Sequence, residues 1–357
     1  MKRTYYLLMA IAAGVTAIHA QQQEAGSGFE MRTTLTFQGS YSHQDSNTAD
    51  GAMRATFYPT IKFSDHWSID GVVQVHSQPF FFEELTTGAH GVRTDLLQAR
   101  LTYARFWNNK SIAVKAGQLS TAFGSFGLRY DDARNPLVDV PPTYGYYYDA
   151  VTMRGLTGAE VDATAGKLDA RAQFTNSSPA NPRSVFQSDQ YGSWTGGAGY
   201  TIKQGFRVGV SGYRGPYLDR DYAFFYPGEI APKKLPASGV GVDVQWGAGP
   251  WNVSGEWQRF VMQYTAIPNF VQQSGYAEFK RTLGPRWYVA TRLGYLRANA
   301  YPAPNTYEMA VGYRPNRNQL VKVEYEIQES PVIRGTLSNT LAVQLVTTLK
   351  PLGFAWR

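Results

Sequence analysis

The sequence predicts an all-β protein, a transmembrane antiparallel β-barrel of about sixteen strands. Apolar and polar residues alternate within its segments, and short turns alternate with long connections along the chain. In residues 31–42, Leu35 and Phe37 lie on an apolar face. Thr34 and Thr36 lie on the opposite, polar face. Because successive side chains of a strand point to opposite sides, one face can meet lipid and the other water.

The first twenty residues are predicted to be a signal peptide rather than part of the fold. Lys2 and Arg3 precede the apolar run 7–18, and the small residue Ala20 closes it. This order indicates cleavage after Ala20, with a retained anchor as the alternative. Residues 1–20 are therefore assigned to export, and residues 21–357 to one barrel domain.

Composition excludes several other classes. After residue 20 the chain has no run of about 18 apolar residues, which excludes a helical membrane protein. The mean hydropathy of -0.34 suits a barrel, in which every second strand residue is apolar. The 35 Gly, 24 Tyr, 19 Phe and 8 Trp suit curved strands with aromatic belts, and zero Cys excludes thiol catalysis and zinc-thiolate sites. The net charge of +7 is too small and scattered for nucleic-acid binding.

Breaks between the alternating segments divide the chain into strands. Short breaks, which predict hairpin turns, occur at 64–66, 108–110, 165–167, 203–205, 247–250, 284–286 and 315–318. Longer breaks occur near 43–51, 78–94, 120–150, 176–192, 215–237, 261–270, 297–305 and 328–337. The strict alternation of short and long breaks is typical of a bacterial outer-membrane barrel, with its short turns in the periplasm and both termini on that side.

Tryptophans support this orientation independently. Five of them flank the predicted short turns on the apolar face: Trp67, Trp107, Trp246, Trp251 and Trp287. Such a girdle marks one membrane interface, whereas the core of a soluble β-sandwich, the alternative, would not confine Trp to one end. Charged residues fall on the polar face, with Arg105 and Arg281 beside short turns as the two expected exceptions.

The same parity predicts which charged side chains face the lumen. The expected lining residues are Arg32, Arg54, Lys62, Arg100, Lys115, Arg154, Glu160, Asp162, Arg171, Arg207, Glu256, Glu278, Lys280, Arg292, Glu308, Arg314, Lys322, Glu324 and Glu326. Asp70, Asp169 and Asp243 share this parity. The slight excess of bases predicts at most a mild anion preference. Pairing with a neighbour across the strands is the alternative role of each charge.

The longest connection, 120–150, follows the fifth strand and is the candidate constriction. Its polar and aromatic residues are Arg129, Tyr130, Asp131, Asp132, Arg134, Asp139, Tyr144, Tyr146 and Tyr147. Opposed charges in a confined lumen produce a transverse field that selects by charge, and tyrosines can narrow the passage while bonding water. The alternative is a loop packed outside the barrel.

The segment 115–128, Lys-Ala-Gly-Gln-Leu-Ser-Thr-Ala-Phe-Gly-Ser-Phe-Gly-Leu, resembles a segment of the phosphate-selective porin O and P family. Gly117, Phe123 and Gly124 match that pattern, and Ala122 stands where proline is usual. The resemblance implies a trimeric outer-membrane channel with the loop after strand five folded inward. Phosphate selectivity in that family depends on many lumenal arginines and lysines. The loop here has Arg129 and Arg134 beside three aspartates. The resemblance is therefore used to predict the fold and not phosphate selectivity.

The expected function is passive, cofactor-free diffusion of small hydrophilic solutes or ions through the outer membrane of a Gram-negative cell, by a protein that is not an enzyme and holds no metal. One alternative is a sugar channel with an aromatic slide formed by Tyr213, Tyr217, Tyr222, Phe224, Phe225 and Tyr226. Another is an adhesion barrel without an open pore. A hydrolase would need His76 on the outer wall, whereas parity turns it inward.

Overall fold

The computed structural model describes residues 27–43, 48–78, 80, 91–144, 155–178, 186, 191–216, 235–265, 268–299, 305–329 and 337–355. Its strands are β1 (Gly28–Ser42), β2 (Thr48–Lys62), β3 (Trp67–Gln78), β4 (Gly91–Trp107), β5 (Lys110–Leu119), β6 (Leu156–Ala165), β7 (Leu168–Thr175), β8 (Ser193–Lys203), β9 (Phe206–Pro216), β10 (Pro236–Ala248), β11 (Trp251–Met262), β12 (Phe270–Thr282), β13 (Trp287–Ala298), β14 (Asn305–Tyr313), β15 (Gln319–Glu329), β16 (Leu337–Thr348) and β17 (Leu352–Ala355).

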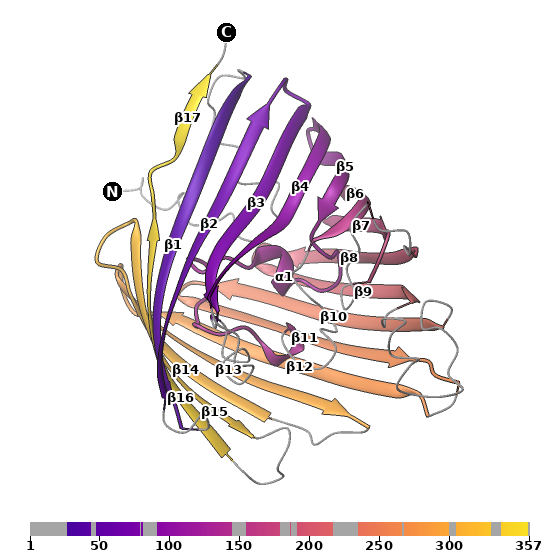
Figure 1. Cartoon of the computed structure of the whole chain (residues 1–357). Coiled ribbons are helices and arrows are strands. Elements are labelled where there is room, and N and C mark those ends of the chain that lie inside the picture. Colours follow the sequence, from indigo (N-terminus) through magenta and orange to yellow (C-terminus); the bar gives the residue numbers. More distant parts are fainter. Residues whose placement is uncertain are drawn as a thin grey trace.

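These strands form one closed antiparallel sheet, as Figure 1 shows. Each strand from β1 to β16 pairs with the next along the chain, and β1 closes the ring by pairing with β2 on one side and with β16 and β17 on the other. Because β17 continues β16 along the same edge of β1, sixteen strands surround the barrel. The predicted fold class is therefore confirmed. No helix in the described part of the chain is long and apolar enough to cross a membrane.

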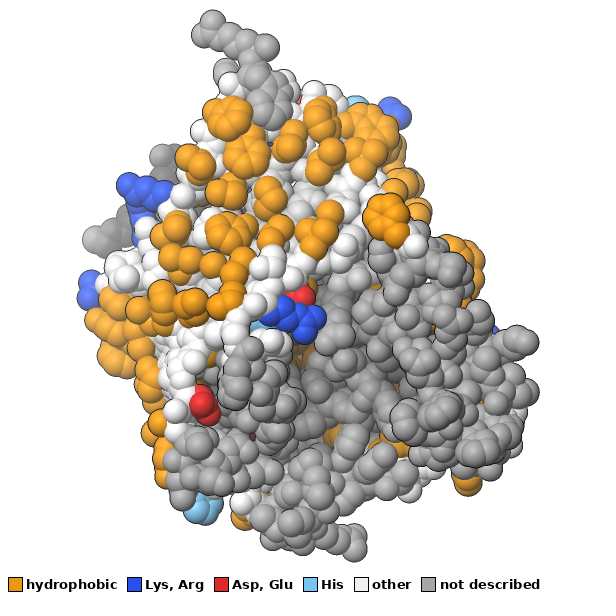
Figure 2. Space-filling view, viewed as in Figure 1, with side chains coloured by type: hydrophobic (Ala, Val, Ile, Leu, Met, Phe, Trp, Pro, Cys, Tyr) orange, Lys and Arg blue, Asp and Glu red, His pale blue; other side chains and the backbone are white. Residues whose placement is uncertain are grey.

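The barrel reverses the usual placement of polar and apolar residues. Large apolar side chains such as Phe37, Val240 and Met309 are exposed on its outside. Figure 2 shows such side chains gathered on the outer surface over β1 to β4. Polar side chains such as Thr36 and Gln344 are buried inside. A soluble protein has no physical reason to expose so much apolar surface, whereas a lipid-facing wall requires it.

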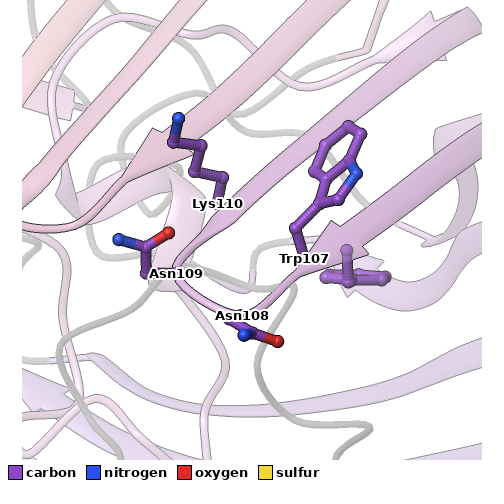
Figure 3. A pocket seen from close by; sticks show the side chains of 5 residues that line it. Trp107, Asn108, Asn109 and Lys110 are labelled. Atoms are coloured by element: carbon purple, nitrogen blue, oxygen red, sulfur yellow. The ribbon is translucent and has the colours of Figure 1, made fainter.

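The seven predicted short turns join the strands where expected. The turn between β4 and β5, for example, is Asn108–Asn109, and Figure 3 shows the open pocket beside it, lined by Trp107 and Lys110 among others. All five tryptophans that flank these turns are at least 36% exposed on the outer wall. The predicted tryptophan girdle is therefore confirmed.

The prediction of two outward-facing arginines was incomplete. Arg105 and Arg281 do point outward, and their guanidinium groups stack over Trp107 and Trp251, 5.2 and 4.8 Å from the ring centroids. Exposed outward arginines also occur near the opposite end of the barrel: Arg214, Arg259 and Arg297. The alternation of charge breaks near both ends of the strands, because a long side chain there can reach polar headgroups.

Candidate functional site

Residues 120–144, here called the crossing segment, run through the interior of the barrel after β5. The segment contains the short helix α1 (Phe126–Arg129) and the 3-10 turn η3 (Pro142–Tyr144). Its side chains and backbone bond to inward-facing residues of β1 and β2 and also to those of β11, β13 and β15. Figure 1 shows α1 within the ring of strands. The segment therefore spans the interior rather than covering the outside.

Two glycines let the chain turn into the barrel. At Gly117, near the end of β5, φ is +132° and an added Cβ would lie 2.3 Å from the Ala99 carbonyl oxygen. At Gly124, φ is +71° and an added Cβ would lie 2.3 Å from the Tyr144 hydroxyl. Side chains at both positions would be strained and would clash. Glu256 of β11 then accepts hydrogen bonds from Ser125 and Tyr144, which holds the two ends of the segment together.

Charged groups attach the middle of the segment to β1 and β2. Asp132 is buried and accepts from the Arg54 guanidinium Nε at 3.0 Å and from the Thr36 hydroxyl at 2.6 Å. Asp131 pairs with Arg32 at 3.2 Å. Arg54 also donates to the Tyr130 hydroxyl at 2.6 Å. Charge-assisted bonds to a carboxylate in a buried setting are strong and directional, so they fix this part of the segment in place.

Lys322 of β15 anchors the next residues from the other side. Its Nζ donates to three backbone carbonyls of the crossing segment, those of Asp132, Asn135 and Leu137, at 3.1, 3.2 and 2.7 Å. The side chain has no exposed surface. An ammonium group has three donors, and all three bond to the backbone here. Lys322 thereby acts as a structural support of the segment, not as a charge on an open wall.

Arg292 of β13 provides a second buried anchor. It pairs with Glu308 at 2.6 Å and with Glu278 at 2.9 Å, and it donates to the Asp139 carbonyl at 3.0 Å and to the Asn135 side chain at 3.1 Å. Five guanidinium donors in one plane suit this crowded set of acceptors. The side chain is fully buried.

Apolar contacts complete the attachment. Leu137 is completely buried in a cluster with residues of four strands, Tyr288, Ala290, Ala310, Leu320 and Val346. A second cluster joins Phe123, Phe126 and Tyr144 to Phe260 and Tyr276 of β11 and β12. Burial of such side chains stabilises a segment by roughly 1.5–3 kcal/mol each. The barrel interior thus has a core, and the crossing segment forms one side of it.

Two carboxyl groups of the segment have opposite pKa shifts. Burial disfavours the charged form of Asp132, but the charges of Arg54 and Lys322 hold its pKa below the usual range. Burial, followed by repulsion from Glu324, raises the pKa of Asp139 to about 7. Asp132 is therefore an ionised anchor, whereas Asp139 titrates near neutral pH.

The wall from β3 to β10 is arranged differently. Its inward charges pair with one another along the wall, such as Arg100 with Asp70, Lys115 with Glu160 and Asp162, and Arg207 with Asp243 on the neighbouring β10 and, across β8, with Asp169. Several of their carboxylates keep contact with solvent, and the side chains of Asp162 and Asp169 are 26% and 30% exposed. These pairs lie along the wall and do not attach the residues 131–139.

The remaining predicted site residues are buried, half-buried, exposed or outside the described part of the chain. Glu324 and Glu326 point inward and are buried, and Glu324 accepts from the backbone amides of Val138 and Asp139. Arg171, Lys280 and Arg314 are half-buried, while Lys62 and Arg134 are exposed. Outside the described residues lie Tyr146, Tyr147, Arg154 and the side chain of Arg129.

The geometry does not support the two alternative sites, the aromatic slide and the hydrolase site at His76. Tyr213 is buried, packs near Phe260, and its hydroxyl bonds to Ser193 and Pro216, so it is an interior packing residue. The other aromatics of the predicted slide, 217–226, lie outside the described residues. His76 points inward as predicted and bonds to Asp95 at 3.0 Å. That orientation is the reverse of what a hydrolase on the outer wall requires.

Comparison with solved structures identifies the fold. OmpF of Salmonella typhi, in complex with daunomycin, superposes with a TM-score of 0.61 at 9% identity, covering 91% of this chain and 98% of that one. The anion-selective porin of Comamonas acidovorans gives 0.58 at 10% identity, covering 91% and 100%. The trimer form of OmpT, an outer membrane protein of Vibrio cholerae, gives 0.55 at 10% identity, covering 90% and 100%.

Sequence comparison adds no closer assignment. No protein-family model matches the chain, and none of the curated proteins matches it. The resemblance of residues 115–128 to the phosphate-selective porins therefore has no support from a family model. The solved structures share their architecture with this chain at low sequence identity. The chain has the fold of the outer-membrane porins.

Proposed function

We propose that this protein is an outer-membrane porin, a passive channel for small hydrophilic solutes and ions. The observation that carries the proposal is the crossing segment, which is bonded to both sides of a closed barrel with a polar inner wall. A barrel of about sixteen strands normally encloses an aqueous channel, and a segment across it narrows the passage. An adhesion barrel has no need of such a segment.

A mild preference for anions is part of the proposal. At the crossing segment Asp131, Asp132 and Asp139 are 7% exposed or less, and Asp131 and Asp132 pair with Arg32 and Arg54. Arg134 is exposed and the Arg32 side chain is 33% exposed. The charges that meet solvent there are thus basic. Partly exposed acids on the wall from β3 to β10, such as Asp169, keep the preference small.

The assembly is proposed to be a homotrimer in the outer membrane, after export by the signal peptide 1–20. OmpT, whose trimer form superposes on this chain, supports the trimer by analogy of fold. The phosphate specificity of the resembling family is not part of the proposal, because the crossing segment pairs its aspartates with the lumenal bases that phosphate would need.

Recordings from planar bilayers test the proposal. Purified protein is expected to produce discrete, voltage-linear conductance steps, and a salt gradient is expected to give a reversal potential displaced slightly toward anions. A folded barrel that never conducts would support the adhesion alternative. A clear cation preference would be compatible with the channel proposal but would contradict the proposed anion preference.

A further inference from the structure

Three residues on neighbouring strands form a polar row on the lipid-facing side of the barrel. Arg259 of β11 is in register with Gln273 of β12, which is in register with Arg297 of β13. Strands lie about 5 Å apart, so the two arginine Cα atoms are roughly 10 Å from each other. We call Arg259, Gln273 and Arg297 the outer arginine row.

The row lies at the end of the barrel away from the short turns. Arg259 is near the end of β11, Gln273 near the start of β12 and Arg297 near the end of β13. Both arginines are exposed. An outward arginine at the midplane of a bilayer costs about 2–4 kcal/mol, but this cost falls to about 0–1 kcal/mol near the interface. The position of the row is therefore compatible with a membrane, and it is close to headgroups.

An aromatic layer lies one step nearer the middle of the barrel. Trp257, Gly275 and Tyr295 are in register on the same three strands, and Trp257 is 37% exposed. Gly275 leaves room for the Tyr295 ring, which lies 3.0 Å from the position of an added Cβ. Aromatic side chains prefer the region of the membrane interface. The arginines thus stand directly above the level at which headgroups begin.

The side chains of the row keep donors available. Within the described part of the chain, neither a hydrogen bond nor an ion pair engages the side chain of Arg259 or Gln273. The Arg297 guanidinium lies 5.7 Å from the Tyr295 ring, a contact that leaves its N–H groups in the plane free to donate. The carboxylate of Glu329, which also faces outward, accepts a hydrogen bond from Asn305 and not from the row.

We propose that the outer arginine row binds the phosphate groups of an anionic glycolipid in the outer leaflet of the surrounding membrane. A guanidinium group matches phosphate with two parallel hydrogen bonds, and the Gln273 amide adds a donor between the two cations. A lipid headgroup is the partner because the row faces outward, above an aromatic layer. The inference rests on the proposed outer-membrane location, although not on the channel being open.

Lipid binding by the purified barrel tests this inference. The protein in a zwitterionic detergent is titrated with lipid A, a phosphorylated glycolipid, and bound lipid is counted by native mass spectrometry. Removing one surface charge near a membrane weakens binding about fivefold, so the double variant R259Q/R297Q is expected to bind at least about tenfold more weakly. The matched control R281Q removes an outward arginine at the other end and is expected to bind as wild type does.

Equal binding by the double variant and wild type would overturn the inference. So would undiminished binding of dephosphorylated lipid A, or full displacement of lipid A by inorganic phosphate, which would indicate a simple anion site. Retention of the β-sheet circular dichroism spectrum excludes misfolding of the variants. If the barrel never conducts but the variants still lose lipid A, the channel proposal fails and the lipid site stands.

Discussion

The inner wall of the barrel has two regions that use the same strand pattern for different purposes. On β11 to β15, with β1 and β2, inward charges such as Arg292 and Lys322 are fully buried against the crossing segment. On β3 to β10, charges such as Asp162 and Asp169 pair along the wall and stay partly hydrated. The difference shows that inward charges can serve either as buried anchors of the crossing segment or as partly hydrated pairs along the wall.

The largest expected effect comes from removing a buried anchor. R292M leaves Glu278 and Glu308 without their cation, and loss of one partner from a buried pair lowers the free energy of unfolding by about 3–5 kcal/mol. The matched variant R100M leaves Asp70, whose side chain is 22% exposed and also accepts from Thr102, with access to water and is expected to cost about 1–3 kcal/mol. Denaturant unfolding in detergent micelles, followed by tryptophan fluorescence, measures both. Equal losses would remove the distinction between the two regions.

The second effect concerns the attachment of the crossing segment. K322M deprives three buried carbonyls of their donor, which weakens the attachment by about 1–3 kcal/mol for each group that stays unsatisfied. The segment is then expected to leave its position part of the time, so single-channel conductance rises and becomes noisier. K115M removes a wall cation paired with Glu160 and Asp162 and should leave conductance nearly unchanged. The reverse order of the two effects would refute the anchoring role of Lys322.

The third effect is a dependence on pH. The pKa of Asp139 is raised to about 7 by burial and by Glu324, so the folded protein holds this proton more tightly than the unfolded chain does. The stabilising contribution is fully present below pH 4 or so and is lost as pH rises through about 7. Unfolding midpoints of wild type should therefore fall relative to those of D139N between about pH 4 and pH 7. A constant difference between the two proteins across that range would contradict this assignment.

The smallest effect is on ion selectivity. R134Q and R32Q each remove a base that meets solvent at the crossing segment, so the reversal potential in a salt gradient should move slightly toward cations. D169N, on the wall from β3 to β10, should move it slightly toward anions. Shifts of the same sign in D169N and in the two arginine variants would show that local charge does not govern permeation.

Much of the fold could be predicted from sequence because its signals are local. Alternation within a segment such as 31–42, the polar short turns and the tryptophans beside them each depend on neighbouring residues. The rule that charged residues fall on the polar face of a strand does not extend to Arg259 and Arg297, which are exposed on the outside. Near the outer ends of strands, headgroups replace hydrocarbon and charge is tolerated on either face.

The candidate site was less predictable. Parity placed Lys322 and Glu324 on the inner side, but it carried no information on the segment that buries them. The contact between Arg54 and Asp132 joins residues far apart in the chain and depends on how the segment crosses the barrel. A positive φ at Gly124 is likewise a property of the folded path, although the Phe-Gly pair within 115–128 was a signal for a turn there.

Single-channel conductance of the purified protein in a planar bilayer tests the central claim most directly. A narrowed, water-filled barrel predicts discrete steps that vary linearly with voltage and that become larger and noisier in K322M. Folded protein that inserts into the bilayer and gives no conductance steps, in wild type and in K322M alike, would contradict it.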